Sequence, residues 1–276
     1  NHSATGDYLL AKSFVVDPHQ LRQAAHKISD EVYQALLGRP GVFSTRIAFI
    51  NWYITSRFDV ATSKMVPKYY WSLQVTDADG RNQQTILKSP WPIMSPSWSP
   101  DGRSLAYVSF ENNQSGVYLQ NIATGKRQLV SRADGVNGAP AFSPDGSQLA
   151  VVLSISGHSK IYTIKLPHGK PVPLMAGNAN LSTIDTEPTW APDGKSIVFT
   201  SDRGGTPQLY QYMLHSNGQP PQRLTFNGNY NAHAEFFPSG QSLVLMHRTQ
   251  GSTIFNIAKL NLSNQEIRLL TRDISS

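Results

Sequence analysis

The chain has 276 residues, of which 15% are charged and 10% aromatic, and it carries no cysteine and a net charge of +6. The absence of cysteine excludes disulfides, and the absence of an apolar run of about 18 residues argues against a transmembrane helix. The basic residues are scattered along the sequence instead of forming a stripe with interleaved aromatic side chains, so we expect no nucleic-acid partner.

The first 43 residues predict a strand followed by a helix. Residues Tyr8–Val16 are typical of a strand, Asp17 is a favourable N-cap and Pro18 is a favourable first helical residue. Apolar residues then recur at helical spacing until Gly38, which is typical of the end of a helix. Because one strand and one helix cannot bury their apolar faces alone, residues 1–43 either pack on the rest of the fold or are the C-terminal end of an α/β domain, and we favour the second interpretation.

Two short patterns could hold a metal ion, but a structural role explains each of them better. His26 and Asp30 lie four residues apart on the predicted helix, where they can form a catalytic or metal-binding pair or a structural hydrogen bond. The segment from Asp77 to Gly80 begins like a calcium-binding loop but lacks the glutamate that such a loop needs further along. We therefore expect a hairpin turn there.

A short motif recurs four times in the rest of the chain. An aromatic residue is followed, after one intervening residue, by Pro, then Asp or Ser, then Gly, and the copies start at Trp98, Phe142, Trp190 and Phe236. Their spacings of 44, 48 and 46 residues indicate a repeat architecture. Pro, Asp and Gly favour a turn, and short alternating apolar stretches surround it, so each repeat contains four short predicted strands.

Four strands in 40–50 residues are the size of one propeller blade. A further unit without the motif precedes the four repeats, with strands expected at residues 46–52, 69–76 and 84–87. We therefore predict an all-β fold in which residues 44–276 form a β-propeller of four-stranded antiparallel blades, with about five blades visible of an expected six. The four motif aromatics should pack between neighbouring blades.

The repeats differ most in the stretch just before each motif, where the chain enters the innermost strand beside the central channel. These stretches combine Met, Ala and small polar residues with an acid and a histidine. Such a composition suits a shallow docking surface at one end of a propeller, although ordinary connecting loops explain the pattern almost equally well. The candidate partner-binding residues are Met94, Ser95, Pro96, Asn137, Ala139, Thr186, Glu187 and His233.

The sequence contains no motif typical of an enzyme. Neither G-x-S-x-G nor H-E-x-x-H is present, and the aspartate of the motif recurs from repeat to repeat, as a structural turn residue does. We expect no catalytic residue, no metal and no cofactor. The alternative is the propeller domain of a peptidase or a metal-dependent propeller hydrolase. It would need several Asp, Glu or His side chains around the channel, where the sequence offers mainly Asp185, Glu187 and His233.

Several segments closely resemble the TolB family, and the resemblance extends over nearly the whole chain. They are Ala25–Tyr33, Thr45–Phe49, Met94–Gly102, Asn137–Gly146 and Thr186–Trp190. The helical pattern His-x-x-Ser-Asp-Glu-Val followed by Thr-Arg-Ile-Ala is specific, whereas Ser-Pro-Asp-Gly turns occur in many propellers. Members of this family have an N-terminal α/β domain and six blades, so the resemblance implies that this sequence is truncated at both ends.

The resemblance also implies a non-enzymatic role in the periplasm. TolB-like proteins are adaptors of the Tol–Pal system, which serves cell envelope integrity, cell division and protein transport. Their propeller binds the peptidoglycan-associated lipoprotein Pal through one end, and colicins exploit the same surface during import. An N-terminal segment, which is absent from this sequence, binds TolA. We therefore expect Pal as the partner, and no direct membrane span.

Overall fold

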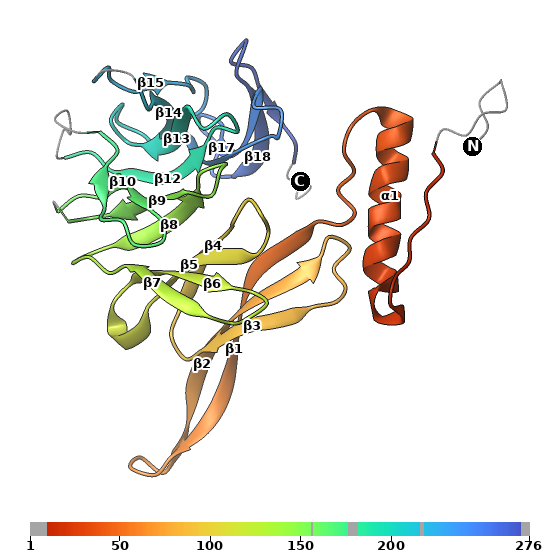
Figure 1. Cartoon of the computed structure of the whole chain (residues 1–276). Helices are drawn as coiled ribbons and strands as arrows, with labels where there is room; N and C mark the ends of the chain where they lie inside the picture. Colours follow the sequence, from red (N-terminus) through yellow and green to blue (C-terminus); the bar gives the residue numbers. More distant parts are fainter. Residues whose placement is uncertain (1–9, 156, 176–181, 216–217, 272–276) are drawn as a thin grey trace. The chain divides into compact units, whose positions relative to one another are not determined.

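The computed structural model describes residues 10–155, 157–175, 182–215 and 218–271 (Figure 1). The chain divides into two compact units, Asn1–Trp52 with Ser72–Lys88 and Tyr53–Trp71 with Ser89–Ser276. This division differs from the predicted domain boundary after residue 43, because residues 46–52 and 72–88 group with the helix. Among the described residues, no helix is both long and apolar enough to cross a membrane.

The first unit contains the predicted helix. A 3-10 turn, η1 (Pro18–Gln20), leads into α1 (Leu21–Leu37), and the Asp17 carboxylate accepts a hydrogen bond from the His19 N–H at 2.8 Å. Gly38 ends α1 with a φ of 70°, and its N–H donates to a carbonyl of the last turn at 2.9 Å. None of the residues of α1 is buried, so its apolar side chains are not part of a core in the described structure.

The strand expected at Tyr8–Val16 does not form where the structure describes it. Residues 10–16 have no regular secondary structure, and residues 8 and 9 lie outside the described residues. A strand needs a neighbour to pair its backbone N–H and C=O groups, and none of the described strands pairs with this segment. The expectation was wrong because a strand pattern carries no information about whether such a neighbour exists.

A three-stranded sheet follows, in the order β1 (Arg46–Asp59), β2 (Lys64–Asp77) and β3 (Gln84–Ser89). It contains the three strands expected before the first repeat. The segment after β2 is the expected hairpin turn, since the Gly80 N–H donates to the Asp77 carbonyl at 2.9 Å. β1 and β2 are each 14 residues long, so they extend well beyond the predicted strands as a hairpin.

Each of the four repeats forms a four-stranded antiparallel sheet whose strands follow one another in chain order. The innermost strands of successive sheets contact one another, β4 with β8, β8 with β12, and β12 with β16 (Figure 1). The unit expected before them forms the three-stranded sheet instead, so these sheets are four of the about five predicted propeller blades. Their strands are β4 (Ile93–Trp98), β5 (Ser104–Ser109), β6 (Gly116–Asn121), β7 (Arg127–Ser131); β8 (Asn137–Phe142), β9 (Gln148–Leu153), β10 (Lys160–Lys165), β11 (Val172–Pro173); β12 (Asp185–Trp190), β13 (Ser196–Ser201), β14 (Gln208–Met213), β15 (Gln222–Arg223); β16 (Tyr230–Phe236), β17 (Ser242–Arg248), β18 (Asn256–Asn261) and β19 (Ile267–Leu269), with a 3-10 turn, η2 (Glu111–Asn113), between β5 and β6.

The motif aromatics join neighbouring blades, as predicted for three of the four copies. Trp190 is 7% exposed, packs with Ile161 of the preceding blade and Phe199 of its own, and donates its indole N–H to the Ala141 carbonyl at 3.1 Å. Phe142 and Phe236 pack in the same way against clusters drawn from two successive blades. Trp98, in the first blade, is half-buried. The core of this unit therefore lies between the blades.

Candidate functional site

A bulge interrupts each of the four innermost strands at the same place. The pairing register with the next strand shifts between Met94 and Ser97 in β4, and at the corresponding points of β8, β12 and β16. Inside each bulge one residue has a positive φ, between 42° and 52°, which is uncommon for residues other than glycine. Bulges re-aim side chains, so the same backbone feature presents a different residue in each blade. These residues are Ser95, Ala139, Glu187 and His233.

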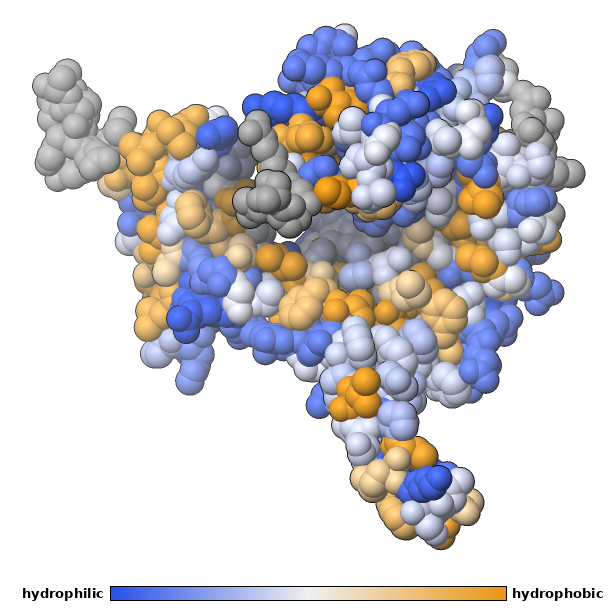
Figure 2. Space-filling view, turned by 180° about the vertical axis from the view of Figure 1, so that it is seen from behind, coloured by the Kyte–Doolittle hydropathy of each residue, from blue (hydrophilic) through white to orange (hydrophobic). Residues whose placement is uncertain are grey.

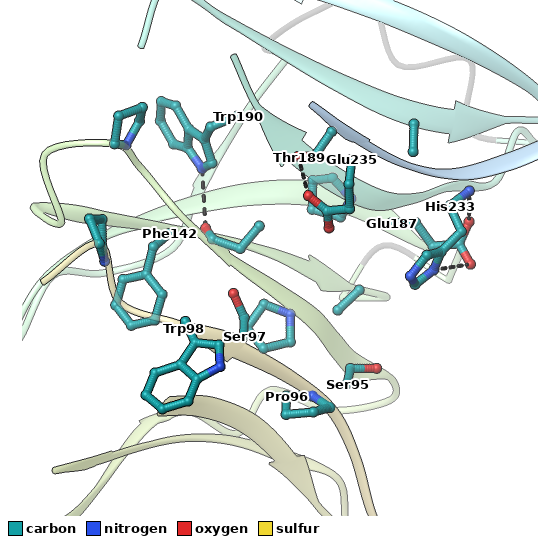
Figure 3. Close-up of a pocket in the computed structure, with 17 residues that line it drawn as sticks. Ser95, Pro96, Ser97, Trp98, Phe142, Glu187, Thr189, Trp190, His233 and Glu235 are labelled. Atoms are coloured by element: carbon teal, nitrogen blue, oxygen red, sulfur yellow. Dashed lines mark hydrogen bonds and ion pairs between the residues drawn. The ribbon is translucent and has the colours of Figure 1, made fainter. Parts of the chain in front are cut away.

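The four bulge residues line one cavity of about 520 Å3 (Figure 3). A proline follows directly after three of them, and Pro96, Pro140 and Pro188 add apolar wall. The next layer holds the side chains two residues after each bulge residue, among them Thr189 and Glu235, and three of the motif aromatics, Trp98, Phe142 and Trp190, lie beyond. The cavity is thus built from equivalent positions of four blades but is chemically asymmetric, with its charged groups on β12 and β16.

The structure brings together five of the eight candidate residues and separates three. Ser95, Pro96, Ala139, Glu187 and His233 line the cavity. Met94 is exposed on β4 and Thr186 is half-buried on β12, but neither lines it.

Asn137 is a correction, because the structure places it in the interior instead of on a docking surface. Its side-chain oxygen accepts hydrogen bonds from the Ala133 N–H at 2.8 Å and the Ser131 hydroxyl at 3.0 Å, and its amide donates to the Ala133 carbonyl at 2.7 Å. The equivalent residues of the next two blades, Asp185 and Asn231, are buried as well. Asn137 lies two residues before the bulge residue Ala139 and holds the preceding loop through these hydrogen bonds. The bulge residue itself faces the cavity.

Glu187 and His233 form a polar pair in the cavity wall (Figure 3). The Glu187 carboxylate accepts hydrogen bonds from the Thr200 hydroxyl at 2.8 Å and the His233 backbone N–H at 2.9 Å, and lies 3.3 Å from His233 Nδ1. Burial by itself would raise the pKa of Glu187, but the hydrogen bonds from His233 and Thr200 outweigh it and lower that pKa. The hydrogen bond to Glu187 raises the pKa of His233, against the opposing effect of burial. The pair is therefore biased towards its charged form.

Glu235 was missed by the sequence argument. It lies on β16 in the cavity wall, accepts a hydrogen bond from the Thr189 hydroxyl at 2.9 Å, and has its pKa raised mainly by burial. The sequence contains a usable signal, because the same position holds Ser97, Ala141 and Thr189 in the other blades, so a glutamate there is the exception.

A second cluster of titratable groups lies in the first unit. Within the described part of the chain, His26, Asp77 and Asp79 are the one group of three such side chains whose ligand atoms lie within 4.8 Å of one another. Arg22 already neutralises it, with its Nε 3.0 Å from Asp77 and its terminal nitrogen bonded to Asp79. We therefore interpret this cluster as an ion-pair network.

Asp30 has a structural role and is not part of a metal or catalytic pair with His26 among the contacts of the described residues. Its carboxylate accepts hydrogen bonds from the backbone N–H groups of Phe43 at 2.6 Å and Ser44 at 3.0 Å, so it holds the segment after α1.

Comparisons with known proteins agree with this architecture. The family described as "TolB beta propeller domain" matches residues 33–276. The "Tol-Pal system protein TolB" of Bordetella pertussis is 49% identical over 192 residues, which are 70% of this chain and 40% of that protein. The chain thus spans about two fifths of the length of this curated relative.

Solved structures add two findings. The crystal structure of TolB from Acinetobacter baumannii matches with a TM-score of 0.79 and 37% identity, covering 97% of this chain and 63% of that one. An oligogalacturonate lyase in complex with manganese matches with a TM-score of 0.52 and 14% identity over 82% of this chain and 73% of that one. At that identity the second likeness concerns the fold alone.

Proposed function

The chain belongs to the TolB β-propeller family, and from this premise we propose that it is a non-enzymatic periplasmic adaptor of the Tol–Pal system that binds Pal through its propeller. The similarity to Tol-Pal system protein TolB of Bordetella pertussis supports membership of that system. The same membership supports a role in envelope integrity, while contacts with TolA and with colicins stay predictions from the resemblance.

The observation that carries the proposal is the asymmetry of the cavity. Four equivalent bulges present Ser95, Ala139, Glu187 and His233, so a nearly symmetric scaffold offers one hydroxyl, one small apolar floor and one charged pair. A volume of about 520 Å3 is in the range of specific binding pockets and can admit a few side chains of a partner. Specific recognition needs such differences, because four identical blades would offer a partner four equivalent orientations.

The pair on β12 and β16 is the expected anchor. The Glu187 carboxylate is already bound by Thr200 and His233, so it is held in place before a partner arrives. A pre-oriented carboxylate can accept a hydrogen bond from a partner without losing further side-chain entropy. Pro96 and Ala139 supply flat apolar wall against which a partner segment can pack.

The proposal is tested by filling the cavity with a bulky side chain. We expect Ala139→Arg to abolish binding of purified Pal in isothermal titration calorimetry, with a thermal unfolding midpoint close to that of the parent. The left-handed backbone at Ala139 already accommodates a Cβ, so the longer side chain adds steric bulk without a new backbone cost. Ala123→Arg, at an exposed alanine in the turn between β6 and β7, is the matched control.

A second variant separates steric from charge effects. Glu187→Gln keeps the shape but removes the charge, and we expect it to weaken Pal binding about tenfold or more if a partner group pairs with it. Glu266→Gln, on an exposed glutamate, should bind as the parent does. If Ala139→Arg and Glu187→Gln both bind Pal like the parent, the interface lies elsewhere.

The enzymatic alternative has its own test. A propeller hydrolase would turn over peptide or ester substrates, and a metal-dependent one would lose that activity on chelation. Turnover that disappears in Glu187→Gln or in a Glu235→Gln variant would overturn the non-enzymatic proposal.

A further inference from the structure

The long hairpin formed by β1 and β2 has a defined register between residues 53 and 71. The rings of Tyr53 and Tyr70 stack with centroids 5.6 Å apart, and the Thr55 hydroxyl donates to the Lys68 carbonyl at 3.4 Å. The two pairs, Tyr53 with Tyr70 and Thr55 with Lys68, fit one and the same antiparallel register. Because side chains alternate between the two faces of a strand, even-numbered residues of β1 share a face with odd-numbered residues of β2.

One face of this hairpin is apolar and open to solvent. Extended along the strands, this register puts Ile54 opposite Tyr69 and Phe58 opposite Met65, and strand alternation then assigns all four residues to one face. They are 51%, 45%, 56% and 61% exposed in that order. In Figure 2 the hairpin projects at the bottom of the view, and its tip shows hydrophobic patches beside hydrophilic surface. Large apolar side chains rarely cluster in solvent without a binding role.

The opposite face is cationic. Arg57 and Lys68 lie there, and Lys64 is placed there opposite Asp59. The Lys68 ammonium lies over the Tyr70 ring, 4.9 Å from its centroid, in a cation–π contact on this face. Three cations and one acid leave this short element with an excess of positive charge.

We propose that this hairpin docks on the surface of a lipid bilayer rich in anionic phospholipid. Aromatic side chains favour the interface between hydrocarbon and water, where Tyr69 and Phe58 can enter with Met65 and Ile54. An end-on approach of the hairpin tip brings the basic side chains of the opposite face level with the lipid phosphates, so their attraction to an anionic surface adds to the apolar burial. The surface is separate from the cavity, so the inference does not depend on Pal binding.

The test uses the whole chain and vesicles of two compositions. We expect the protein to co-sediment with vesicles of equimolar phosphatidylcholine and phosphatidylglycerol, and far less with phosphatidylcholine alone. The double variant Phe58→Ser/Met65→Ser should lower the partition coefficient on the anionic vesicles more than tenfold. Its matched control is Phe226→Ser/Met213→Ser, which removes an equally large pair of exposed side chains, 59% and 48% exposed, from the blades.

The charge contribution is measured separately. Arg57→Gln/Lys64→Gln should reduce binding to the anionic vesicles about fivefold for each cation removed. Lys126→Gln/Lys195→Gln changes the net charge of the protein equally at exposed lysines of the blades and should leave binding nearly unchanged.

Three outcomes would overturn the proposal. The first is that the parent protein is absent from the vesicle pellet. The second is that the hairpin variants and the control variants lose vesicle binding equally. The third is that the parent does not bind vesicles but is a dimer in light scattering, and the hairpin variant is a monomer. The last outcome would assign the apolar face to a second copy of the chain. Thermal unfolding midpoints of the hairpin variants close to that of the parent, measured in parallel, show that a loss on vesicles is not a loss of folding.

Discussion

At the scale of single residues, the bulge position concentrates the differences between the blades. The same left-handed backbone carries Ser95, Ala139, Glu187 and His233, and each non-glycine residue in this conformation costs about 1 kcal/mol or more. Because all four blades have such a residue at the equivalent place, the fold tolerates this conformational free energy in every innermost strand that lines the cavity. The position therefore accepts different side chains while the backbone stays the same.

The Glu187–His233 pair predicts a pH dependence of stability. Because the pKa of His233 is raised, the contribution of this histidine to the stability of the fold is present below the ordinary histidine pKa of 6.5. It is lost as the pH rises through the raised pKa. The lowered pKa of Glu187 means that its contribution is present above 4.5 and is lost as the pH falls through the lowered value. Both residues therefore contribute fully to stability only at pH values between the ordinary pKa of a glutamate, 4.5, and that of a histidine, 6.5.

We therefore expect His233→Ala to destabilise the protein most near pH 5.5 and less near pH 8.5, by under about 1 kcal/mol, because the histidine side chain is 66% exposed. Urea unfolding at the two pH values measures the difference. His158→Ala, at another exposed histidine of the same unit, is the control. A destabilisation that is the same at both pH values would contradict the ion pair.

At the scale of elements, the aromatic residue of the motif connects neighbouring blades by packing between them. Trp190 starts the turn that ends β12, yet its side chain packs in a cluster with residues of β9 and β10 and its indole N–H bonds to β8. A motif whose spacing is visible in the sequence thus creates a hydrogen bond between residues that are 49 positions apart. The turns of successive motifs also lie next to one another, because the proline of each motif lies beside the glycine of the next.

Trp190→Ala should lower the free energy of unfolding by about 3–5 kcal/mol, because it removes a nearly buried aromatic side chain and leaves a cavity between two blades. Urea denaturation followed by circular dichroism measures the change. Trp52→Ala, at a tryptophan that is 58% exposed, should cost less than about 1 kcal/mol. Equal effects of the two substitutions would mean that Trp190 is not a joint of the core.

At the scale of the whole molecule, the second unit is held together by clusters that each span two successive blades. One cluster joins Ala106 and Leu149, the next Ile161 and Phe199, and the third Leu209 and Leu245, so each blade after the first is tied to the one before it. A blade cannot leave such a chain of contacts without exposing the apolar face of its neighbour. The blades should therefore unfold together.

Leu149→Ala tests this cooperativity, since it empties a fully buried position in the cluster between the first and second blades. We expect amide protection against hydrogen exchange to fall by about 2–5 kcal/mol in β9 and also in β17, two blades further along. Mass spectrometry of the exchanged peptides measures both. A loss of protection confined to the first two blades would show that each pair of blades opens independently.

The repeat architecture followed from local patterns alone. Turn residues and strand alternation act over a few neighbours, and their recurrence at Trp98, Phe142, Trp190 and Phe236 predicted the blades that form. Local rules also predicted the helix that Gly38 ends, because capping depends on residues next to one another.

Tertiary structure decided the rest, because burial and pairing depend on neighbours that the local sequence does not contain. Asn137 and Ala139 stand two residues apart in one stretch, yet a bulge in β8 buries the first and turns the second into the cavity. Residues 10–16 carry a strand pattern but find no strand to pair with, and Glu235 joins the cavity only because β16 lies beside β12. Which blades meet, and which side chains they enclose, is a property of the assembled sheets.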